Sequence, residues 1–341
     1  MEPLVSILIP AYNSEAWIAD TLESALAQTW PRKEIIVVDD GSTDRTLTVA
    51  REFASKDVSV LTQPNRGAAA ARNKAYSISQ GQYVQWLDAD DLLASDKISR
   101  QMEVCRSGLD PQVLLSGAWG NFVYRTRKAR FVPSPLWENL TPLEWLLRKM
   151  EHNAHMQPAT WLVSRELTEA AGPWDTRLSL DDDGEYFCRV LMASRGIRFV
   201  AEARTFYRVT GSGSLSYAGG SSKKLDSLLL SIRLHIDDVI KLDRSDRARS
   251  ACLTYLQKYM FDFHPERPDI VQQLQEIARS LGGSLEMPKL SWKYAWIHRV
   301  FGWSAARRTH IRYNQIKWSL AKWWDKTCFE AEARRHAKAG A

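Results

Sequence analysis

Residues 82–91 read Gln-Tyr-Val-Gln-Trp-Leu-Asp-Ala-Asp-Asp, an apolar run with strand character that ends in three carboxylates within four residues. Ligands of open α/β sheets bind just beyond the carboxyl ends of the strands. Crowded carboxylates repel one another unless a cation joins them, and Mg²⁺ binds carboxylates together with substrate phosphates. Asp88, Asp90 and Asp91 therefore predict a metal site that serves a phosphate-bearing substrate. A second interpretation is that Asp90 and Asp91 only open a helix, since aspartate suits helix N-termini.

The chain before this stretch alternates between strand and helix at short spacing. This alternation implies right-handed βαβ units and a mainly parallel sheet. In such a sheet, Asp39 and Asp40 lie at the same edge as the acidic stretch at 88–91. The predicted strands are residues 5–9, 34–38, 58–61 and 83–87, and the predicted helices follow Asn13 or Ser14, Ser42, Thr43 or Asp44, and Gly67.

Four motifs follow one another in this half of the chain. They are Pro-Ala-Tyr-Asn at 10–13, Val-Val-Asp-Asp-Gly-Ser-Thr-Asp at 37–44, Gly-Ala-Ala-Ala-Ala-Arg-Asn at 67–73 and Leu-Asp-Ala-Asp-Asp at 87–91. In this order they resemble the nucleotide-binding half of family 2 glycosyltransferases, over about residues 1–125. The resemblance implies an α/β fold of the GT-A type, the nucleotide-diphospho-sugar transferase fold, in which helices flank a mainly parallel central sheet.

The resemblance also implies roles for individual residues. Tyr12 would border the nucleobase, Asp40 would accept a hydrogen bond from the uracil ring N–H, and Arg72 would lie near the diphosphate. Asp88 and Asp90 would form the DxD element, with Asp88, Asp90 and Asp91 available to a Mn²⁺ or Mg²⁺ ion. Core packing for Tyr12 and a solvated helix position for Arg72 are the alternatives. The full expected nucleotide-sugar set is Pro10, Ala11, Tyr12, Asn13, Asp39, Asp40, Arg72, Asn73, Asp88, Ala89 and Arg208.

A second acid-rich stretch, Asp181-Asp182-Asp183, precedes an aromatic segment that contains Arg189. It resembles the acceptor-side region of the same family, where a Glu-Asp pair precedes such a helix. Inverting glycosyl transfer needs a carboxylate that takes the acceptor hydroxyl proton, and the match favours Asp183 as this base, with Asp182 second. The chain departs from the family pattern by its extra Asp181 and by Gly184, where an aromatic residue is common. The alternative is an exposed acidic N-cap for a helix at 185–194.

Residues 198–200 and 205–209 predict closing strands, followed by a Gly/Ser-rich loop to residue 222 that suits closure over a substrate. Many relatives carry a Tyr-Arg-x-His element here, whose histidine binds the metal. Thr210 stands in the place of that histidine, so no metal-binding histidine is expected, and Arg208 is expected to neutralise phosphate instead.

The remainder of the chain differs in composition. The chain carries a net charge of +6, yet residues from 289 onward hold twelve Lys and Arg against three Asp and Glu, together with six tryptophans. We expect residues 1–222 to form the catalytic domain, as a nucleotide-sugar half (1–125) and an acceptor half (126–222), and residues 223–341 a helical region. Basic amphipathic helices with tryptophan suit an anionic membrane surface. The alternative is a helical cap whose aromatic face packs on the catalytic domain.

Several classes of protein are excluded or disfavoured by what the sequence lacks. The four cysteines form no CxxC pair, which fits a reducing compartment. Neither a signal peptide nor a spanning helix is expected, so the predicted location is the cytoplasm, peripheral on the inner face of the plasma membrane. No dinucleotide fingerprint, P-loop or nucleic-acid-binding module is recognisable, so no nucleic-acid partner is expected.

These features predict an inverting, metal-dependent glycosyltransferase. Its donor would be a nucleotide-sugar, expected to be a UDP-sugar, and its acceptor a saccharide or lipid-linked hydroxyl in surface polysaccharide or glycolipid synthesis. A nucleotide-sugar-binding protein without turnover is the alternative from another class. A sugar nucleotidyltransferase would need a Gly-rich basic loop after the first strand, and residues 10–13 are not such a loop.

Overall fold

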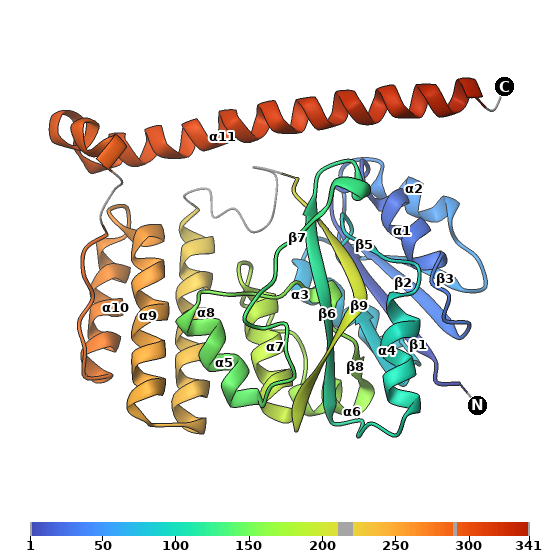
Figure 1. The fold of residues 1–341 in the computed structure, drawn as a ribbon, viewed down its shortest axis with the longest axis horizontal. Helices are drawn as coiled ribbons and strands as arrows, with labels where there is room; N and C mark the ends of the chain where they lie inside the picture. The colour runs from blue at the N-terminus through green and yellow to red at the C-terminus, as the bar shows by residue number, and fades with distance from the viewer. Residues whose placement is uncertain (1, 211–220, 289–291, 340–341) are drawn as a thin grey trace.

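The computed structural model describes residues 2–210, 221–288 and 292–339. Its strands are β1 (Val5–Ala11), β2 (Lys33–Asp39), β3 (Val58–Thr62), β4 (Tyr83–Trp86), β5 (Leu92–Leu93), β6 (Val113–Phe122), β7 (Arg130–Phe131), β8 (Val163–Ser164) and β9 (Gly196–Arg208). They form one sheet in the order β3-β2-β1-β4-β8 and a second in the order β5-β9-β6-β7 (Figure 1). The predicted loop at 211–220 lies outside the described residues.

The first sheet is parallel from β3 to β4, and only β8 runs antiparallel. In this register Ala11 pairs with Asp39 and Leu8 pairs with Trp86. The residues after β1, β2 and β4 therefore leave the sheet at one edge. This confirms the predicted mainly parallel sheet and the placement of its two acidic strand ends at the same edge.

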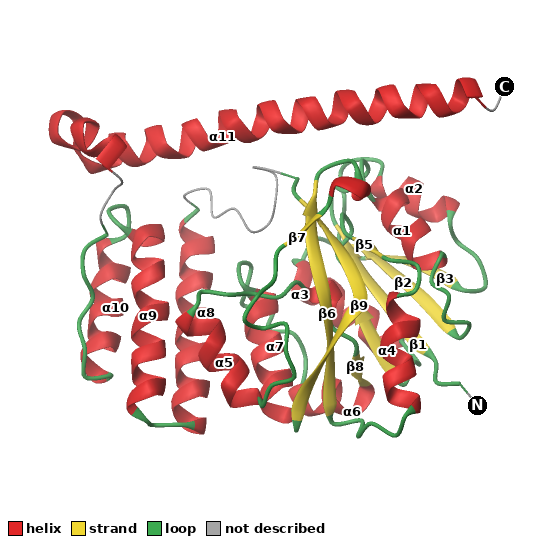
Figure 2. Ribbon diagram, in the orientation of Figure 1, coloured by secondary structure: helices red, strands yellow, loops and turns green. Residues whose placement is uncertain are grey.

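The helices are α1 (Ile18–Leu26), α2 (Thr46–Glu52), α3 (Ala68–Ile78), α4 (Lys97–Arg106), α5 (Pro142–Glu151), α6 (Arg165–Ala171), α7 (Asp182–Ala193), α8 (Ser222–Leu242), α9 (Asp246–Phe263), α10 (Pro268–Ser280) and α11 (Trp292–Ala339). Figure 2 shows α8, α9 and α10 side by side, with α5 and α7 between them and the sheets. Their buried residues belong to the same hydrophobic cluster as those of α5, α6 and α7. Residue 222 therefore marks a change of secondary structure but not a boundary of the core.

Two expectations about strands need correction. The two segments expected at 198–200 and 205–209 are parts of the single strand β9. The sequence also predicts a strand at 159–163, but Pro158–Thr160 forms a 3₁₀ turn and only the short β8 follows it. Side chains take the backbone oxygens that a strand would have used: Gln85 donates to Ala159 O and Lys97 donates to Trp161 O.

The sequence also predicts that Asn13 or Ser14 caps the first helix, and this prediction is wrong. Helix α1 begins at Ile18 without a side-chain cap. Asn13, with a φ of 47°, instead accepts a hydrogen bond from Thr43 N at 2.8 Å through its side-chain oxygen. The loops after β1 and β2 are thus tied together. Asp44 does serve the start of α2, because it accepts from Thr46 N at 2.9 Å.

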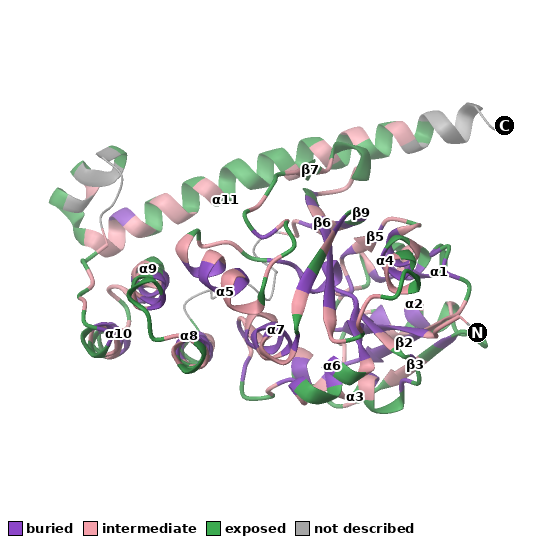
Figure 3. Cartoon of the chain, turned by 60° about the horizontal axis from the view of Figure 1, so that its bottom comes forward, coloured by how far each residue is buried: buried purple, intermediate pink, exposed green. Residues whose placement is uncertain are grey.

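Helix α11 lies across the molecule above the other elements and changes direction at Gly302, whose φ is 79° (Figure 1). Its contacts with residues 2–210 include an ion pair between Asp325 and Arg125 at 2.7 Å and a hydrogen bond from Lys322 to Thr210 O at 3.0 Å. The ring of Phe329 also lies 6.1 Å from that of Tyr124. Its outer surface is exposed (Figure 3). Within the described ranges, no helix is both long and apolar enough to cross a membrane.

Candidate active site

The first side of the site is built at the ends of β1 and β2. Asp40 is buried and accepts hydrogen bonds from Gln63 Nε2 (2.7 Å), Arg66 N (2.9 Å) and Gly67 N (2.8 Å). It therefore fixes the loop that leads into α3. Asp39 accepts from Thr62 Oγ1 at 3.1 Å. The expected role of Asp40 toward a nucleobase stays a prediction, because its carboxylate already organises this loop.

The other residues of the first motif differ in burial: Pro10 and Ala11 lie in the core, whereas Tyr12 lies at the surface. Pro10 and Ala11 are buried within β1, and Ala11 O accepts from Asp40 N at 2.8 Å. Tyr12 is 44% exposed just beyond the strand, so it is not core packing. An exposed ring at the carboxyl end of a parallel strand is placed where a nucleobase could stack.

The acidic turn after β4 is held from behind by Arg208. Arg208 is buried; its backbone N donates to Asp91 Oδ1 at 2.8 Å, and its guanidinium donates to Asp90 O (2.8 Å) and Asp20 Oδ2 (2.8 Å). Ala89 O accepts from Thr21 Oγ1 at 3.0 Å. The structure thus gives Arg208 a different task from the expected phosphate contact: it positions the turn.

The carboxylates in this turn repel one another. Burial, and then the neighbouring carboxylate of Asp88, raise the pKa of Asp90 to about 6. Burial and the carboxylates of Asp90 and Asp88 also raise the pKa of Asp91. A cation near these groups would relieve the repulsion between them.

Arg72 joins the two acid-rich stretches that the sequence predicted separately. Its side chain is 5% exposed, lies 4.3 Å from the centre of the Trp174 ring, and forms ion pairs with Asp88 Oδ1 and Asp182 Oδ2, both at 2.7 Å. It is therefore not a solvated helix residue. Asn73, next to it on α3, exchanges two hydrogen bonds with the backbone of Trp174, at 2.8 and 2.9 Å. Asn73 thus positions the loop before α7.

Three aspartates open helix α7. Asp181 adopts a left-handed conformation (φ 58°) before the helix, and Asp182 is held by Arg72. The side-chain carboxylate of Asp183 forms no hydrogen bond or ion pair with another residue in the described part of the chain. Burial, and then the charges of Asp182 and Asp181, raise its pKa to about 7. A carboxylate with this pKa is suited to proton transfer near neutral pH.

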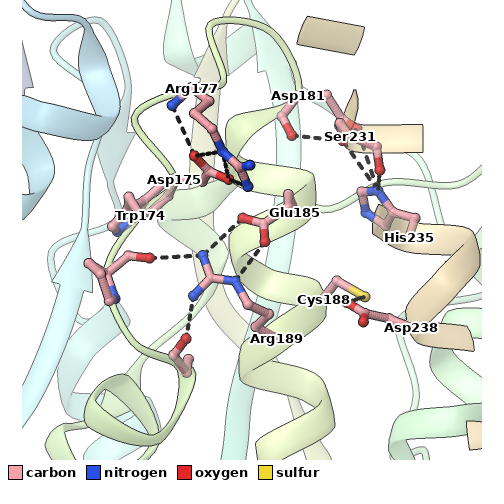
Figure 4. Close-up of polar contacts among 12 residues, drawn as sticks. Trp174, Asp175, Arg177, Asp181, Glu185, Cys188, Arg189, Ser231, His235 and Asp238 are labelled. Carbon is pink, nitrogen blue, oxygen red and sulfur yellow. Dashed lines mark hydrogen bonds and ion pairs between the residues drawn. The ribbon is translucent and has the colours of Figure 1, made fainter. Parts of the chain in front are cut away.

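Ion pairs hold the chain on either side of this acidic turn (Figure 4). Arg189 binds Glu185 at 2.6 Å and donates to Pro173 O at 2.9 Å, while Arg177 binds Asp175 at 2.6 Å. The arginine that the sequence singled out in this helix thus fixes the loop at Pro173 against α7, nearly two helical turns after Asp183.

The carboxylates of Asp88 and Asp90 fit a divalent cation, such as Mg²⁺, that needs few protein ligands. Among the residues that the structure describes, no three His, Cys, Asp or Glu side chains are grouped as a complete protein metal site. Mg²⁺ usually needs only one or two carboxylates and completes its shell with phosphate and water. The raised pKa of Asp90 beside Asp88 marks the place where such an ion would be stabilised.

Comparison with known sequences assigns the first half of the chain to a family. The family model described as Glycosyl transferase family 2 matches residues 6–170. Residues 6–170 are a glycosyl transferase family 2 domain. The predicted family resemblance is confirmed. The matches span only about two fifths of the length of several curated relatives.

One such relative of the family 2 domain is WfaP of Escherichia coli. It is described as a UDP-Glc:alpha-D-GlcNAc-diphosphoundecaprenol beta-1,3-glucosyltransferase and is 45% identical over 102 residues, which are 29% of this chain and 40% of WfaP.

Solved structures show the same fold beyond the family 2 domain. S. aureus TarS 1–349 in complex with UDP-GlcNAc has a TM-score of 0.63 at 19% identity, covering 82% of this chain and 83% of that one. The mannosyltransferase PcManGT from Pyrobaculum calidifontis, in complex with GDP-Man and Mn²⁺, has a TM-score of 0.53 at 22% identity, covering 96% and 88%. The predicted GT-A-type fold is confirmed.

Reasoning from the sequence missed several residues of the site. Asp20 of α1 forms an ion pair with the Arg208 guanidinium. Trp17, just before α1, packs its ring against the same guanidinium. Ser231 and His235 of α8 reach the Asp181 side of the acidic turn. The only signal for the last two was a serine and a histidine four residues apart within an otherwise apolar helix face.

Proposed function

We propose that this protein is a glycosyltransferase that moves a sugar from a nucleotide-diphospho-sugar, most simply a UDP-sugar, to a hydroxyl acceptor with inversion. The family 2 domain supports the reaction class. WfaP and TarS, whose descriptions include UDP-sugars, support the choice of donor. Surface polysaccharide or glycolipid synthesis is the setting we propose, with a saccharide or a lipid-linked acceptor.

The observation that carries the proposal is the bridge from Arg72 to Asp88 and Asp182. It fixes the donor-side turn and the acceptor-side helix at one point. A single displacement needs both substrates in line, and holding them in a fixed geometry supplies much of the rate.

The chemistry then follows from the acidic turn of α7. Asp183 takes the proton of the acceptor hydroxyl as that oxygen bonds to the anomeric carbon, and the bond from this carbon to the nucleotide diphosphate breaks. The raised pKa of Asp183 suits this transfer, and Asp182, neutralised by Arg72, is the second choice. A bound Mn²⁺ or Mg²⁺ ion would offset the charge that develops on the leaving diphosphate.

A panel of nucleotide-sugars, tested first by thermal shift and then for transfer or hydrolysis with Mn²⁺, decides between the two classes of function. A glycosyltransferase releases nucleoside diphosphate with at least one donor. Binding without any turnover, across donors and acceptors, would identify a nucleotide-sugar-binding protein and reject the enzyme.

Metal dependence rests on the acidic turn after β4. We expect Asp90→Ala to abolish stimulation of transfer by Mn²⁺, since Asp90 is our principal candidate ligand, with Asp88 and Asp91 beside it. The same variant should lose the additional rise in Tm that Mn²⁺ gives in the presence of UDP, because only a bound ligand stabilises the folded state.

The control for this variant is Asp57→Ala, which makes the same change at an exposed site ahead of β3. Asp57→Ala should keep both the Mn²⁺ stimulation and the Tm shift. Full Mn²⁺-stimulated activity in Asp90→Ala would remove Asp90 from the metal site.

The membrane role that we propose rests on the orientation of α11. Tyr313, Ile316, Leu320 and Trp323 form one face and are 60–63% exposed, so the expected alternative of an aromatic face packed on the catalytic domain is wrong. The helix contacts that domain through other residues, among them Asp325, which pairs with Arg125, and Phe329, whose ring lies near that of Tyr124. Exposed lysines and arginines border the apolar face: Arg308, Arg312, Lys317, Lys326 and Arg334.

This arrangement suits an anionic lipid surface, where the aromatic side chains enter the interface and the cations meet the headgroups. We therefore propose a cytoplasmic protein peripheral to the inner face of the plasma membrane, with no nucleic-acid partner. A lipid-linked acceptor would be met at that surface.

Vesicle sedimentation tests the membrane role. The intact chain should bind vesicles that contain phosphatidylglycerol more tightly than vesicles of phosphatidylcholine alone, and salt should weaken the binding. Leu320→Ser combined with Trp323→Ser should lower the affinity about tenfold or more, because each buried large apolar side chain contributes roughly 1.5–3 kcal/mol.

The control is Thr309→Ser, on the same helix. Absence of binding to anionic vesicles would reject the membrane proposal, and a dimer that dissociates in the Leu320→Ser, Trp323→Ser variant would assign the face to a second copy of the chain.

A further inference from the structure

A buried chain of polar groups leads from α5 through α8 to the acidic turn. Figure 4 shows its end at His235, Ser231 and Asp181. Lys149 Nζ lies 2.7 Å from His235 Nε2, His235 Nδ1 lies 3.2 Å from Ser231 Oγ, and Ser231 Oγ lies 2.6 Å from Asp181 Oδ2. Lys149 is 7% exposed, and Ser231 and His235 are fully buried. We call Lys149, His235, Ser231 and Asp181 the anchor chain.

Each member of the anchor chain donates a hydrogen bond to the next, from Lys149 toward Asp181. His235 Nδ1 also lies 2.9 Å from the backbone oxygen of Ser231, which can only accept, so Nδ1 carries the proton and Nε2 is free to accept from the Lys149 ammonium. The hydroxyl of Ser231 then donates to the carboxylate of Asp181. Burial, together with the Lys149 charge, lowers the pKa of His235 to about 4, which keeps this ring neutral.

Gly184 makes room for the end of this chain. A Cβ atom placed on Gly184 would lie 2.3 Å from Asp181 Oδ1 and 2.8 Å from Asp181 Cγ. The two departures from the family pattern at 181 and 184 are therefore one feature, since the carboxylate of Asp181 occupies the space of the missing side chain.

Asp181 itself needs support. Its φ of 58° lies in the left-handed region, which costs a non-glycine residue free energy unless the surroundings hold it. Its only described side-chain hydrogen bond is the one from Ser231. Two residues later comes Asp183, on the first turn of α7.

We propose that Lys149, His235 and Ser231 are positioning residues: they hold Asp181, and through it they set the orientation of the first turn of α7, which carries Asp183. This inference rests on the proposed function for its kinetic consequence, but the anchor chain itself is testable without turnover. The C-terminal helices thereby take part in building the acceptor side of the site.

A double-mutant cycle between Asp181→Gly and Ser231→Ala tests the anchor chain. Glycine keeps the left-handed backbone at 181 while removing the carboxylate. We expect each single variant to lower kcat about ten- to a hundredfold with an unchanged KM for the donor, since small misplacements of reacting groups have effects of this size. The double variant should be no worse than Asp181→Gly alone, because the two residues act through one contact.

Asp181→Asn is the conservative variant for this cycle. Asparagine keeps an oxygen that accepts from Ser231 and tolerates the left-handed conformation. It should retain most of kcat, and this rescue would not follow if Asp181 acted only by its charge. Ser250→Ala, an exposed serine on α9, is the matched control and should resemble the wild type.

Urea unfolding supplies the readout that needs no activity. Ser231→Ala should lower the midpoint in the wild-type background and have little further effect in the Asp181→Gly background. Additive midpoint shifts, or a wild-type kcat for Asp181→Gly, would overturn the inference. Absence of turnover in the wild type would reject the proposed function instead, and the unfolding cycle would still decide on the anchor chain.

Discussion

Asp183→Asn is expected to lower kcat about 10²–10⁴-fold, the usual contribution of a positioned general base. Asparagine keeps the size of the side chain but cannot take the acceptor proton. The donor should still bind with little change in KM, because Asp183 faces the acceptor side in our proposal. Steady-state transfer kinetics with a saturating acceptor provide the measurement.

The assignment of Asp183 as the base also predicts how the transfer rate of the wild type depends on pH. A base works in its deprotonated form, and burial together with Asp182 and Asp181 raises the pKa of Asp183 to about 7. Transfer should therefore fall as the pH drops below about 7 and level off above it. Asp237→Asn, the same change at an exposed position on α8, should leave rate and profile unchanged. Equal activity in Asp183→Asn would move the base to Asp182.

Arg72→Met should have the largest effect on stability. It removes the cation from between Asp88 and Asp182 and leaves two partly buried carboxylates without their partner. Breaking a buried ion pair from one side typically costs about 3–5 kcal/mol. We expect the free energy of unfolding in urea to fall by about 3 kcal/mol, and transfer activity to fall at least a hundredfold.

The neighbouring Lys74→Met serves as its control, since Lys74 is exposed on the same helix and loses a charge in the same way. Lys74→Met should change the stability by less than about 0.5 kcal/mol, as is usual for surface sites. An Arg72→Met protein as stable as the wild type would show that the two carboxylates are already neutral or separately solvated.

The sequence was informative where local pattern and topology act together. Strand alternation predicted the parallel sheet, and because parallel strands end at one edge, it also predicted that the acids near Asp40 and Asp88 would lie at the same edge. The four motifs predicted the family that the comparison confirmed.

What the sequence could not supply were partnerships between distant segments. Asn73 reads as a ligand-binding residue in its motif, but its side chain is used to hold Trp174, 101 residues away. The sequence also could not show which face of α11 contacts the domain. That face is set by the ion pair between Asp325 and Arg125 and not by the apolar stripe. Hydrophobic periodicity shows that a helix has two faces, but it does not show which face meets the domain.

The bracing of the acidic turn by Arg208 has a consequence for the order of folding. The contact of Arg208 with Asp91 spans 117 residues, and its ion pair with Asp20 spans 188. Loops of this length close slowly, so we expect β9 to join the structure after the local βα units have formed. Until then the three carboxylates repel one another without this buried counter-charge. A chain still emerging from the ribosome would therefore carry every predicted metal ligand and yet lack a formed site until residue 208 has been made.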